Sequence, residues 1–130
     1  MRIVIWADSS FAVEWLSGTD RAKRIDLPKG TLSILPMQYC EIFSFFLKKS
    51  LDPVTVANEL EALDLQPADK IHLQQASMMY VVARRNPKCK ASLADAILAA
   101  TAKERREKIV AFDDDFADLG LKEKSGIWEP

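Results

Sequence analysis

Three short apolar segments constrain the fold of this chain more than any other feature. Residues 3–7, 31–35 and 109–112 are rich in β-branched, aromatic and other apolar side chains, and polar residues or proline bound them. Continuous apolar runs of this length are typical of strands that are buried on both faces. Because helical patterns separate the runs, the sequence predicts parallel strands joined by helical connections.

Helix signals fill these connections. Asp8, Ser9 and Ser10 are capping residues that precede a helix ending at Gly18. Further helices are predicted over 19–25, 37–49, 53–64, 70–85 and 93–108, with a turn or short helix over 113–119. We expect the helix over 37–49 to be largely buried, because its apolar residues lie nearly all round it.

The remaining extended pieces complete the predicted sheet. A very short one is expected at 65–67, and Ile127 with Trp128 is expected to form a last, edge strand. The predicted fold class is therefore α/β, a three-layer α/β/α arrangement around a central, mainly parallel sheet of four to five strands. The 130 residues show no linker or repeat, so residues 1–130 are expected to form a single domain.

Charge and cysteine content exclude several classes of protein. The 18 Lys and Arg residues against 19 Asp and Glu give a net charge of −1, which excludes binding of nucleic acid by bulk charge. Cys40 and Cys89 match no metal spacing, and Cys40 is expected to be a buried, reduced thiol. The first apolar run is too short for a signal peptide or a membrane span. We expect a cytoplasmic protein with no membrane partner.

Acidic residues directly follow two of the predicted strands. Asp8 comes after the run at 3–7, and three consecutive Asp residues, 113–115, come after the run at 109–112. In a parallel α/β sheet the carboxyl ends of the strands meet at one edge, where functional crevices lie. The sequence therefore predicts an acidic crevice there, although Asp8 and Asp113 could each serve only as helix caps.

Two further carboxylates lie on predicted helices. Asp95 follows Ser92 at the spacing of a capping box, so it could serve only the helix terminus. Glu41 lies among apolar residues, where a carboxylate without a partner is costly to bury. Carboxylates held close together repel one another unless a cation neutralises them, and Mg²⁺ or Mn²⁺ takes such oxygen ligands. A zinc site is not expected, because the single histidine, His72, lies away from these motifs and is expected to be exposed or partly packed.

Taken in order, these motifs resemble the PIN domain, and within it the VapC-type ribonuclease toxins of prokaryotic toxin–antitoxin pairs. The resemblance rests on the strand before Asp8-Ser9-Ser10, on Glu41 in a helix after Pro36, and on the segments 92–102 (SLADAILAATA) and 110–116 (VAFDDDF). It covers nearly the whole chain. One departure is Ala111-Phe112, which stands where a threonine often precedes the fourth acid.

This resemblance implies both a site and an activity. The catalytic acids of the family fall on Asp8, Glu41, Asp95 and Asp113; the metal ligands fall on Asp8, Asp95 and Asp113, with Glu41 and Asp115 as additional candidates, and Ser10 supports Asp8. The implied reaction is hydrolysis of RNA phosphodiester bonds with Mg²⁺ or Mn²⁺ as cofactor. The implied partners are an RNA substrate, a cognate antitoxin protein and a second copy of the chain in a homodimer.

A basic stretch offers a contact for the RNA backbone. Between residues 84 and 108, eight Lys and Arg residues lie among three acids, whereas the segment after residue 112 is acidic. The candidates for RNA binding are Arg84, Arg85, Lys88, Lys90 and Lys103. The same residues could instead only solvate helix ends, because cations suit helix carboxyl termini.

Rival functions fit the sequence less well. A receiver-type phosphoacceptor module needs an Asp after a middle strand and a Lys after a late one, but here Pro36 and three Asp residues follow those strands. A phosphatase with an Asp-x-Asp nucleophile would carry that motif after its first strand rather than at 113–115. A catalytically inactive PIN-like interaction module is a third alternative, against which the four intact acids argue.

Overall fold

The structure is a computed structural model that describes residues 3–27 and 31–130. Its elements in chain order are β1 (Ile5–Ala7), α1 (Ser9–Ser17), α2 (Asp20–Lys23), β2 (Leu32–Ile34), α3 (Pro36–Lys48), α4 (Pro53–Leu60), β3 (Asp64–Leu65), α5 (Lys70–Ala83), α6 (Leu93–Arg105), β4 (Lys108–Val110), α7 (Asp115–Asp118), β5 (Lys122–Lys124) and β6 (Ile127–Glu129). Strands and helices therefore alternate through most of the chain, as predicted.

The strands form one sheet in the order β3-β2-β1-β4-β6-β5. β1 lies at its centre and pairs in parallel with β2 on one side and with β4 on the other. β3 continues the parallel part beyond β2, whereas β6 runs antiparallel to both β4 and β5. Consequently the carboxyl ends of β1 and β4, which precede the acidic segments, lie next to each other.

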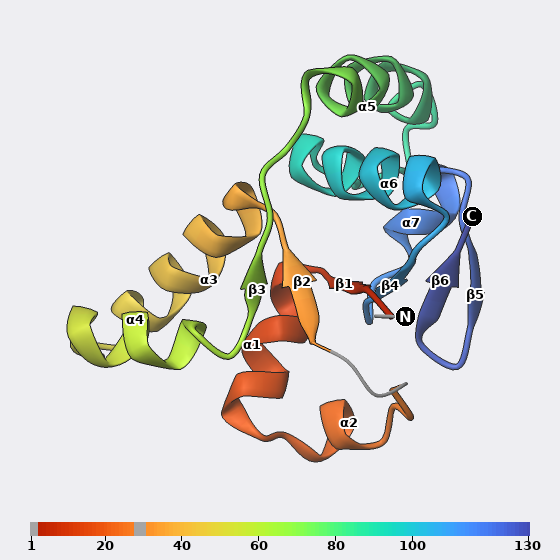
Figure 1. Cartoon of the computed structure of the whole chain (residues 1–130). Helices are drawn as coiled ribbons and strands as arrows, with labels where there is room; N and C mark the ends of the chain where they lie inside the picture. The colour runs from red at the N-terminus through yellow and green to blue at the C-terminus, as the bar shows by residue number, and fades with distance from the viewer. Residues whose placement is uncertain (1–2, 28–30) are drawn as a thin grey trace.

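Helices cover both faces of the sheet. Successive side chains of β1 point to opposite faces, and all three are buried, so each face needs a covering layer. Trp6 belongs to a core with the alanine-rich α6 and with α5, while Ile5 and Ala7 belong to a second core with Phe11 of α1. In Figure 1 α5 and α6 lie above the row of strands, and α1 and α2 lie below it. The predicted three-layer α/β/α arrangement with a mainly parallel sheet is therefore confirmed.

The sheet is wider than the sequence predicts. It has six strands in the part of the chain that the structure describes, rather than four or five. The additional strand is β5, whose Lys-Glu-Lys sequence carries no apolar signal. β5 pairs with β6, so β6 is not the predicted edge strand and β5 forms that edge instead. Lys122 and Lys124 keep this edge charged, which discourages pairing with another chain.

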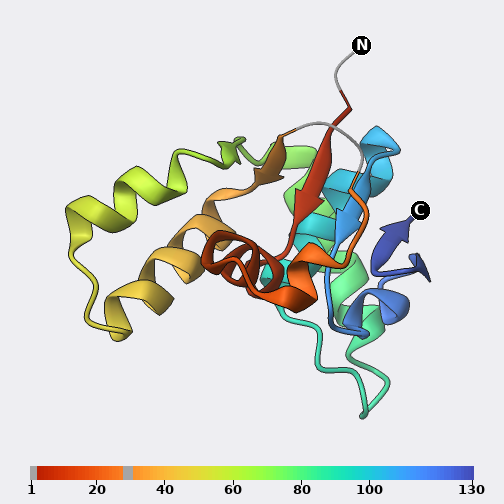
Figure 2. The ribbon, with the colours of Figure 1, turned by 90° about the horizontal axis from the view of Figure 1, so that it is seen from below.

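The prediction of a largely buried helix at 37–49 is wrong. In α3 only Gln38 and Ile42 are buried, and Phe45 is 41% exposed. Figure 2 shows the reason, because α3 and α4 run out from the sheet as a helical hairpin. A helix in such a projecting arm has apolar residues on faces that the sheet cannot reach. Cys40, on the same helix, is an exposed free thiol rather than a buried one.

The prediction for His72 is also wrong, since its side chain is only 1% exposed. It lies on the face of α5 that packs on α6, where Nε2 is 3.2 Å from Oε2 of Glu104. The same face carries Ala76 and Ala83, and these small residues let the two helices approach closely.

None of the helices that the structure describes is long and apolar enough to cross a membrane.

Candidate active site

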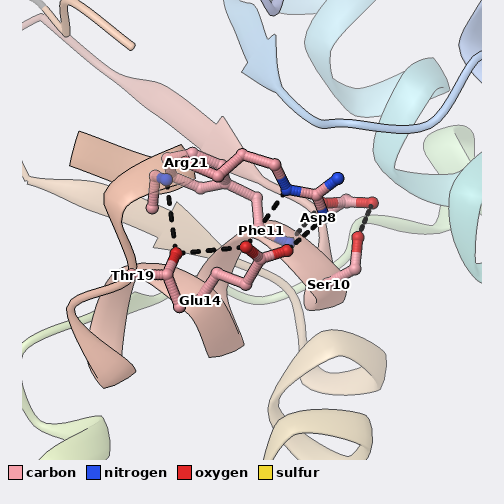
Figure 3. Close-up of polar contacts among 7 residues, drawn as sticks. Asp8, Ser10, Phe11, Glu14, Thr19 and Arg21 are labelled. Carbon is pink, nitrogen blue, oxygen red and sulfur yellow. Dashed lines mark hydrogen bonds and ion pairs between the residues drawn. The ribbon is translucent and has the colours of Figure 1, made fainter. Parts of the chain in front are cut away.

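Asp8 occupies the junction between the central strand and the helix that follows it. It is the N-cap of α1, and its Oδ1 accepts a hydrogen bond of 2.9 Å from the backbone N–H of Phe11. Its Oδ2 accepts a second bond of 3.0 Å from the Ser10 hydroxyl, as Figure 3 shows. The side chain is buried, with an exposed fraction of 4%. Asp8 is therefore both a helix cap and a buried carboxylate fixed at the sheet edge.

Glu41 approaches the same junction from α3. The hydroxyl of Ser9, the residue after Asp8, donates a hydrogen bond of 2.8 Å to Oε1 of Glu41. Glu41 is exposed, so the expectation of a costly buried carboxylate is corrected. A cavity of about 360 Å³ lies beside this contact and is lined by Ser9, Ser10, Val13, Glu14, Glu41 and Phe45. There is thus open space next to the two serines that hold Asp8 and Glu41.

Asp95 lies in the first turn of α6 and forms the predicted capping box. Its backbone N–H donates to Ser92 Oγ at 3.1 Å, and its Oδ2 accepts from the Ser92 backbone N–H at 3.0 Å. The capping reading of Asp95 is therefore confirmed. It leaves the other carboxylate oxygen, Oδ1, available for a further interaction, so a cap and a ligand role are compatible.

Asp113 and Asp115 form a turn after β4. Oδ1 of Asp113 accepts a hydrogen bond of 2.9 Å from the backbone N–H of Asp115, which begins α7. The Asp115 carboxylate in turn accepts a bond from the backbone N–H of Lys90, in the loop before α6. Segments that are far apart in sequence therefore meet at this end of the sheet.

The carboxylates influence one another's protonation. Burial raises the pKa of Asp8 to about 7, and the charges of Asp95 and Asp113 add to this effect against the bonds from Phe11 and Ser10. Burial also raises the pKa of Asp95, assisted by repulsion from Asp113 and Glu41. The pKa of Asp115 is raised to about 6 by burial, by its contact with Asp113 and by the Asp95 charge. Five acids from four parts of the chain therefore share one electrostatic site, and the sheet-edge rule accounts for those that follow β1 and β4.

Their chemistry fits a hard divalent cation. The site offers carboxylate oxygens, the ligands that Mg²⁺ and Mn²⁺ prefer, and a cation would relieve both burial and mutual repulsion. Among the residues that the structure describes, no three His, Cys, Asp or Glu side chains are arranged to hold one metal ion. A bound ion would have to draw the carboxylates together from their present positions.

The basic stretch reaches the site only in part. Lys90 adjoins Asp115 through its backbone, and Arg85 and Lys88 are exposed. Two other candidates have partners within the fold: Nη1 of Arg84 donates to the Cys89 carbonyl at 3.1 Å, and Nζ of Lys103 donates to the Leu119 carbonyl at 3.0 Å. These contacts favour a structural role for Arg84 and Lys103.

A charged pair that was not predicted from the sequence adjoins the site. Glu14 of α1 receives hydrogen bonds from Thr19 and Arg21, which lie at the start of α2. The guanidinium carbon of Arg21 lies 3.9 Å above the centre of the Phe112 ring. No local sequence pattern predicts these contacts. The turn at Gly18 brings Arg21 to Glu14, and the packing of the segment after β4 brings Phe112 to Arg21.

Comparison with known proteins gives a consistent family match. A family model described as the PIN domain matches residues 5–122. A search of curated protein sequences finds no significant match.

Solved structures with the same fold include three toxin–antitoxin proteins. VapC20 of Mycobacterium tuberculosis, described as a toxin that cleaves the sarcin–ricin loop, has a TM-score of 0.71 at 22% identity over 93% of this chain and 98% of its own. A toxin–antitoxin complex from Klebsiella pneumoniae gives 0.63 at 22% identity, covering 87% of this chain and 90% of that one. VapBC2 of Rickettsia felis, bound to a DNA fragment from its promoter, gives 0.69 at 12% identity, covering 91% and 94%.

Proposed function

This chain belongs to the PIN domain family, and from that premise we propose that it is a metal-dependent endoribonuclease that acts as the toxin of a toxin–antitoxin pair. The observation that carries the proposal is the shared site of five carboxylates, in which burial and repulsion raise the pKa of Asp8, Asp95 and Asp115. Such a cluster is costly without a cation and suited to holding one.

Each acid has a proposed role that follows from its position. Asp8, Asp95 and Asp113 would hold Mg²⁺ or Mn²⁺, because they lie at the adjacent ends of β1 and β4 and at the start of α6. Glu41 and Asp115 are additional candidates for ligands, and Glu41 would orient the attacking water from the exposed side of the site. Ser10 supports Asp8 through the hydrogen bond to its Oδ2.

A bound divalent ion would supply a water of lowered pKa and would stabilise negative charge on the phosphate oxygens. The protein's own groups then have to bind and position the RNA strand. Arg85, Lys88 and Lys90 are exposed cations of the basic stretch, and Lys90 adjoins Asp115. We propose that these three contact the RNA backbone.

The proposal includes partners and a location. A cognate antitoxin and a second copy of the chain are the proposed protein partners, and the structural neighbours in Klebsiella pneumoniae and Rickettsia felis support the first of these. The neighbour described as a toxin that cleaves the sarcin–ricin loop supports RNA as substrate. We place the activity in the cytoplasm, where the RNA is.

A cleavage assay with matched variants tests this function. Purified chain is incubated with structured and single-stranded RNA in Mg²⁺, in Mn²⁺ and in EDTA. We expect cleavage only with metal, and we expect Asp95→Asn to abolish it because the amide keeps an oxygen acceptor for the Ser92 N–H but loses the charge. Asp52→Asn is the control, since Asp52 caps α4 and is not one of the acids of the site. Undiminished cleavage in EDTA or by Asp95→Asn would refute the proposal.

A further inference from the structure

Arg21 is held in one orientation by Glu14. Its Nε donates to Oε1 of Glu14 at 3.1 Å and its Nη2 donates to Oε2, so the carboxylate grips one edge of the planar guanidinium. The Thr19 hydroxyl donates to the same Oε1 at 3.1 Å and fixes Glu14 in turn. Figure 3 shows this set of bonds between α1 and the start of α2. Such two-point geometry restricts the rotation of an otherwise flexible side chain.

The guanidinium of Arg21 also contacts a pair of packed aromatic rings, which belong to the segments that carry Asp8 and Asp113. Arg21 stacks on the ring of Phe112, and Phe112 packs on Phe11 with ring centres 5.2 Å apart. Phe112 directly precedes Asp113, and the backbone N–H of Phe11 holds Asp8. Arg21 is therefore linked through these aromatic contacts to the two segments that carry Asp8 and Asp113.

The guanidinium is nevertheless open to solvent. The Arg21 side chain is 61% exposed, and its bonds to Glu14 use only one edge of a group that has five N–H donors. An ion pair this exposed stabilises a fold only weakly, because water and salt screen it. Stability alone therefore gives little reason to hold a planar cation so closely.

We propose that Arg21 is a phosphate-binding residue of the substrate site, which holds the RNA backbone beside the carboxylates. The inference rests on the proposed ribonuclease function. It adds an RNA contact from α2, in the N-terminal part of the chain, to those proposed for the basic stretch between residues 84 and 108. An RNA strand that approaches five acids is repelled by them. A guanidinium that stacks on Phe112, the residue before Asp113, and that has N–H groups not used by Glu14 offsets this repulsion and can bind a phosphate through two parallel hydrogen bonds.

RNA binding without cleavage tests the contact directly. In an Asp95→Asn background, the affinity for a short, fluorescently labelled single-stranded RNA is measured by anisotropy at several salt concentrations. We expect Arg21→Ala to weaken binding about fivefold near 0.1 M salt and to lower the slope of log K against log salt by about 0.7, the value for one phosphate contact. Lys23→Ala is the matched control, an exposed cation at the other end of α2 that is expected to change neither quantity.

Two more variants separate phosphate binding from a purely structural clamp. Arg21→Lys keeps the charge, so it should restore the salt slope while recovering only part of the affinity. Glu14→Gln keeps an amide oxygen that can still accept from Arg21 but removes a negative charge that repels RNA, so it should strengthen RNA binding. A purely structural clamp would instead make Glu14→Gln and Arg21→Ala equally destabilising in thermal melts, with unchanged salt slopes. That clamp pattern overturns the inference.

The proposed function can fail separately. If the Asp95→Asn protein binds RNA and the unmodified chain cleaves it, but Arg21→Ala matches Lys23→Ala in affinity and slope, only the role of Arg21 is refuted. If the unmodified chain neither binds nor cleaves RNA, the ribonuclease proposal falls, and the inference about Arg21 falls with it.

Discussion

The hydroxyl of Ser10 donates a 3.0 Å hydrogen bond to Oδ2 of Asp8, whereas the hydroxyl of the adjacent Ser9 donates to Glu41. Two neighbouring serines therefore serve two different carboxylates. The bond from Ser10 lowers the pKa of Asp8 against burial, which raises it to about 7. The balance between these two effects decides how much of the site is ionised near neutral pH.

Removing the Ser10 hydroxyl should shift this balance. We expect Ser10→Ala to raise the pKa of Asp8 further, because the ionised form loses a donor while burial is unchanged. A carbon-detected NMR titration of the metal-free protein measures that pKa. Ser9→Ala is the control and should leave Asp8 unchanged, since its hydroxyl bonds Glu41. An equal pKa of Asp8 in both variants would contradict the assignment.

The stability of the metal-free protein should fall as pH rises. The pKa of Asp8 is about 7 in the folded state against an ordinary value of 3.8. Between these two pH values the folded state keeps a proton that the unfolded state has released, so stability declines by up to about 1.4 kcal/mol per pH unit. Urea unfolding in EDTA at pH 5 and pH 8 measures the decline.

Asp8→Asn should reduce this dependence, because only Asp95 and Asp115 would then carry a raised pKa among the acids of the site for which a shift is seen. The amide keeps an oxygen that can cap α1, so the variant should be more stable than the unmodified protein at pH 8 and similar to it near pH 4. Asp52→Asn, at the N-cap of α4, is the matched control and should retain the decline with pH. A stability that rises from pH 5 to pH 8 and is insensitive to Asp8→Asn would show that burial of Asp8 is not costly.

Divalent metal should stabilise the protein more strongly at high pH than at low pH. Protons compete with the ion at Asp8 and at Asp115, whose pKa values are about 7 and about 6. Thermal melts with added Mg²⁺ should therefore show a clear increase of Tm at pH 8 and little change at pH 5. Asp95→Asn should reduce the increase at pH 8. Equal increases at both pH values would mean that the ion binds elsewhere.

Features coded by short sequence patterns were predictable. The capping box of Ser92 and Asp95 and the helix end at Gly18, with φ of 71°, depend on neighbouring residues alone. The meeting of Asp8 with Asp113 follows from a rule about parallel strands. The sequence therefore predicted the sheet class and the acidic edge of the site.

Features that depend on distant packing were not predictable. The apolar sequence of α3 does not reveal that the helix projects in an arm, which leaves Phe45 and Cys40 exposed. The burial of His72 depends on how closely the alanines of α6 approach it. Arg21 reaches Phe112 only after the fold has formed, because the two lie far apart in the chain.

The outer face of α5 should support the proposed homodimer. Its side chains Met78 and Val82 are 64% and 59% exposed, and they lie one helical turn apart on the face away from Ala76. Apolar side chains on one helix face are typical of surfaces covered by a partner.

We expect Val82→Asp to convert a dimer to a monomer in size-exclusion chromatography with light scattering, because the new carboxylate would be buried without a partner. Ser125→Asp, in the exposed turn between β5 and β6 and away from α5 in Figure 1, should leave the dimer intact. A dimer that survives both Val82→Asp and Met78→Asp would place the interface on another surface, and the projecting arm of α3 and α4 would be tested next.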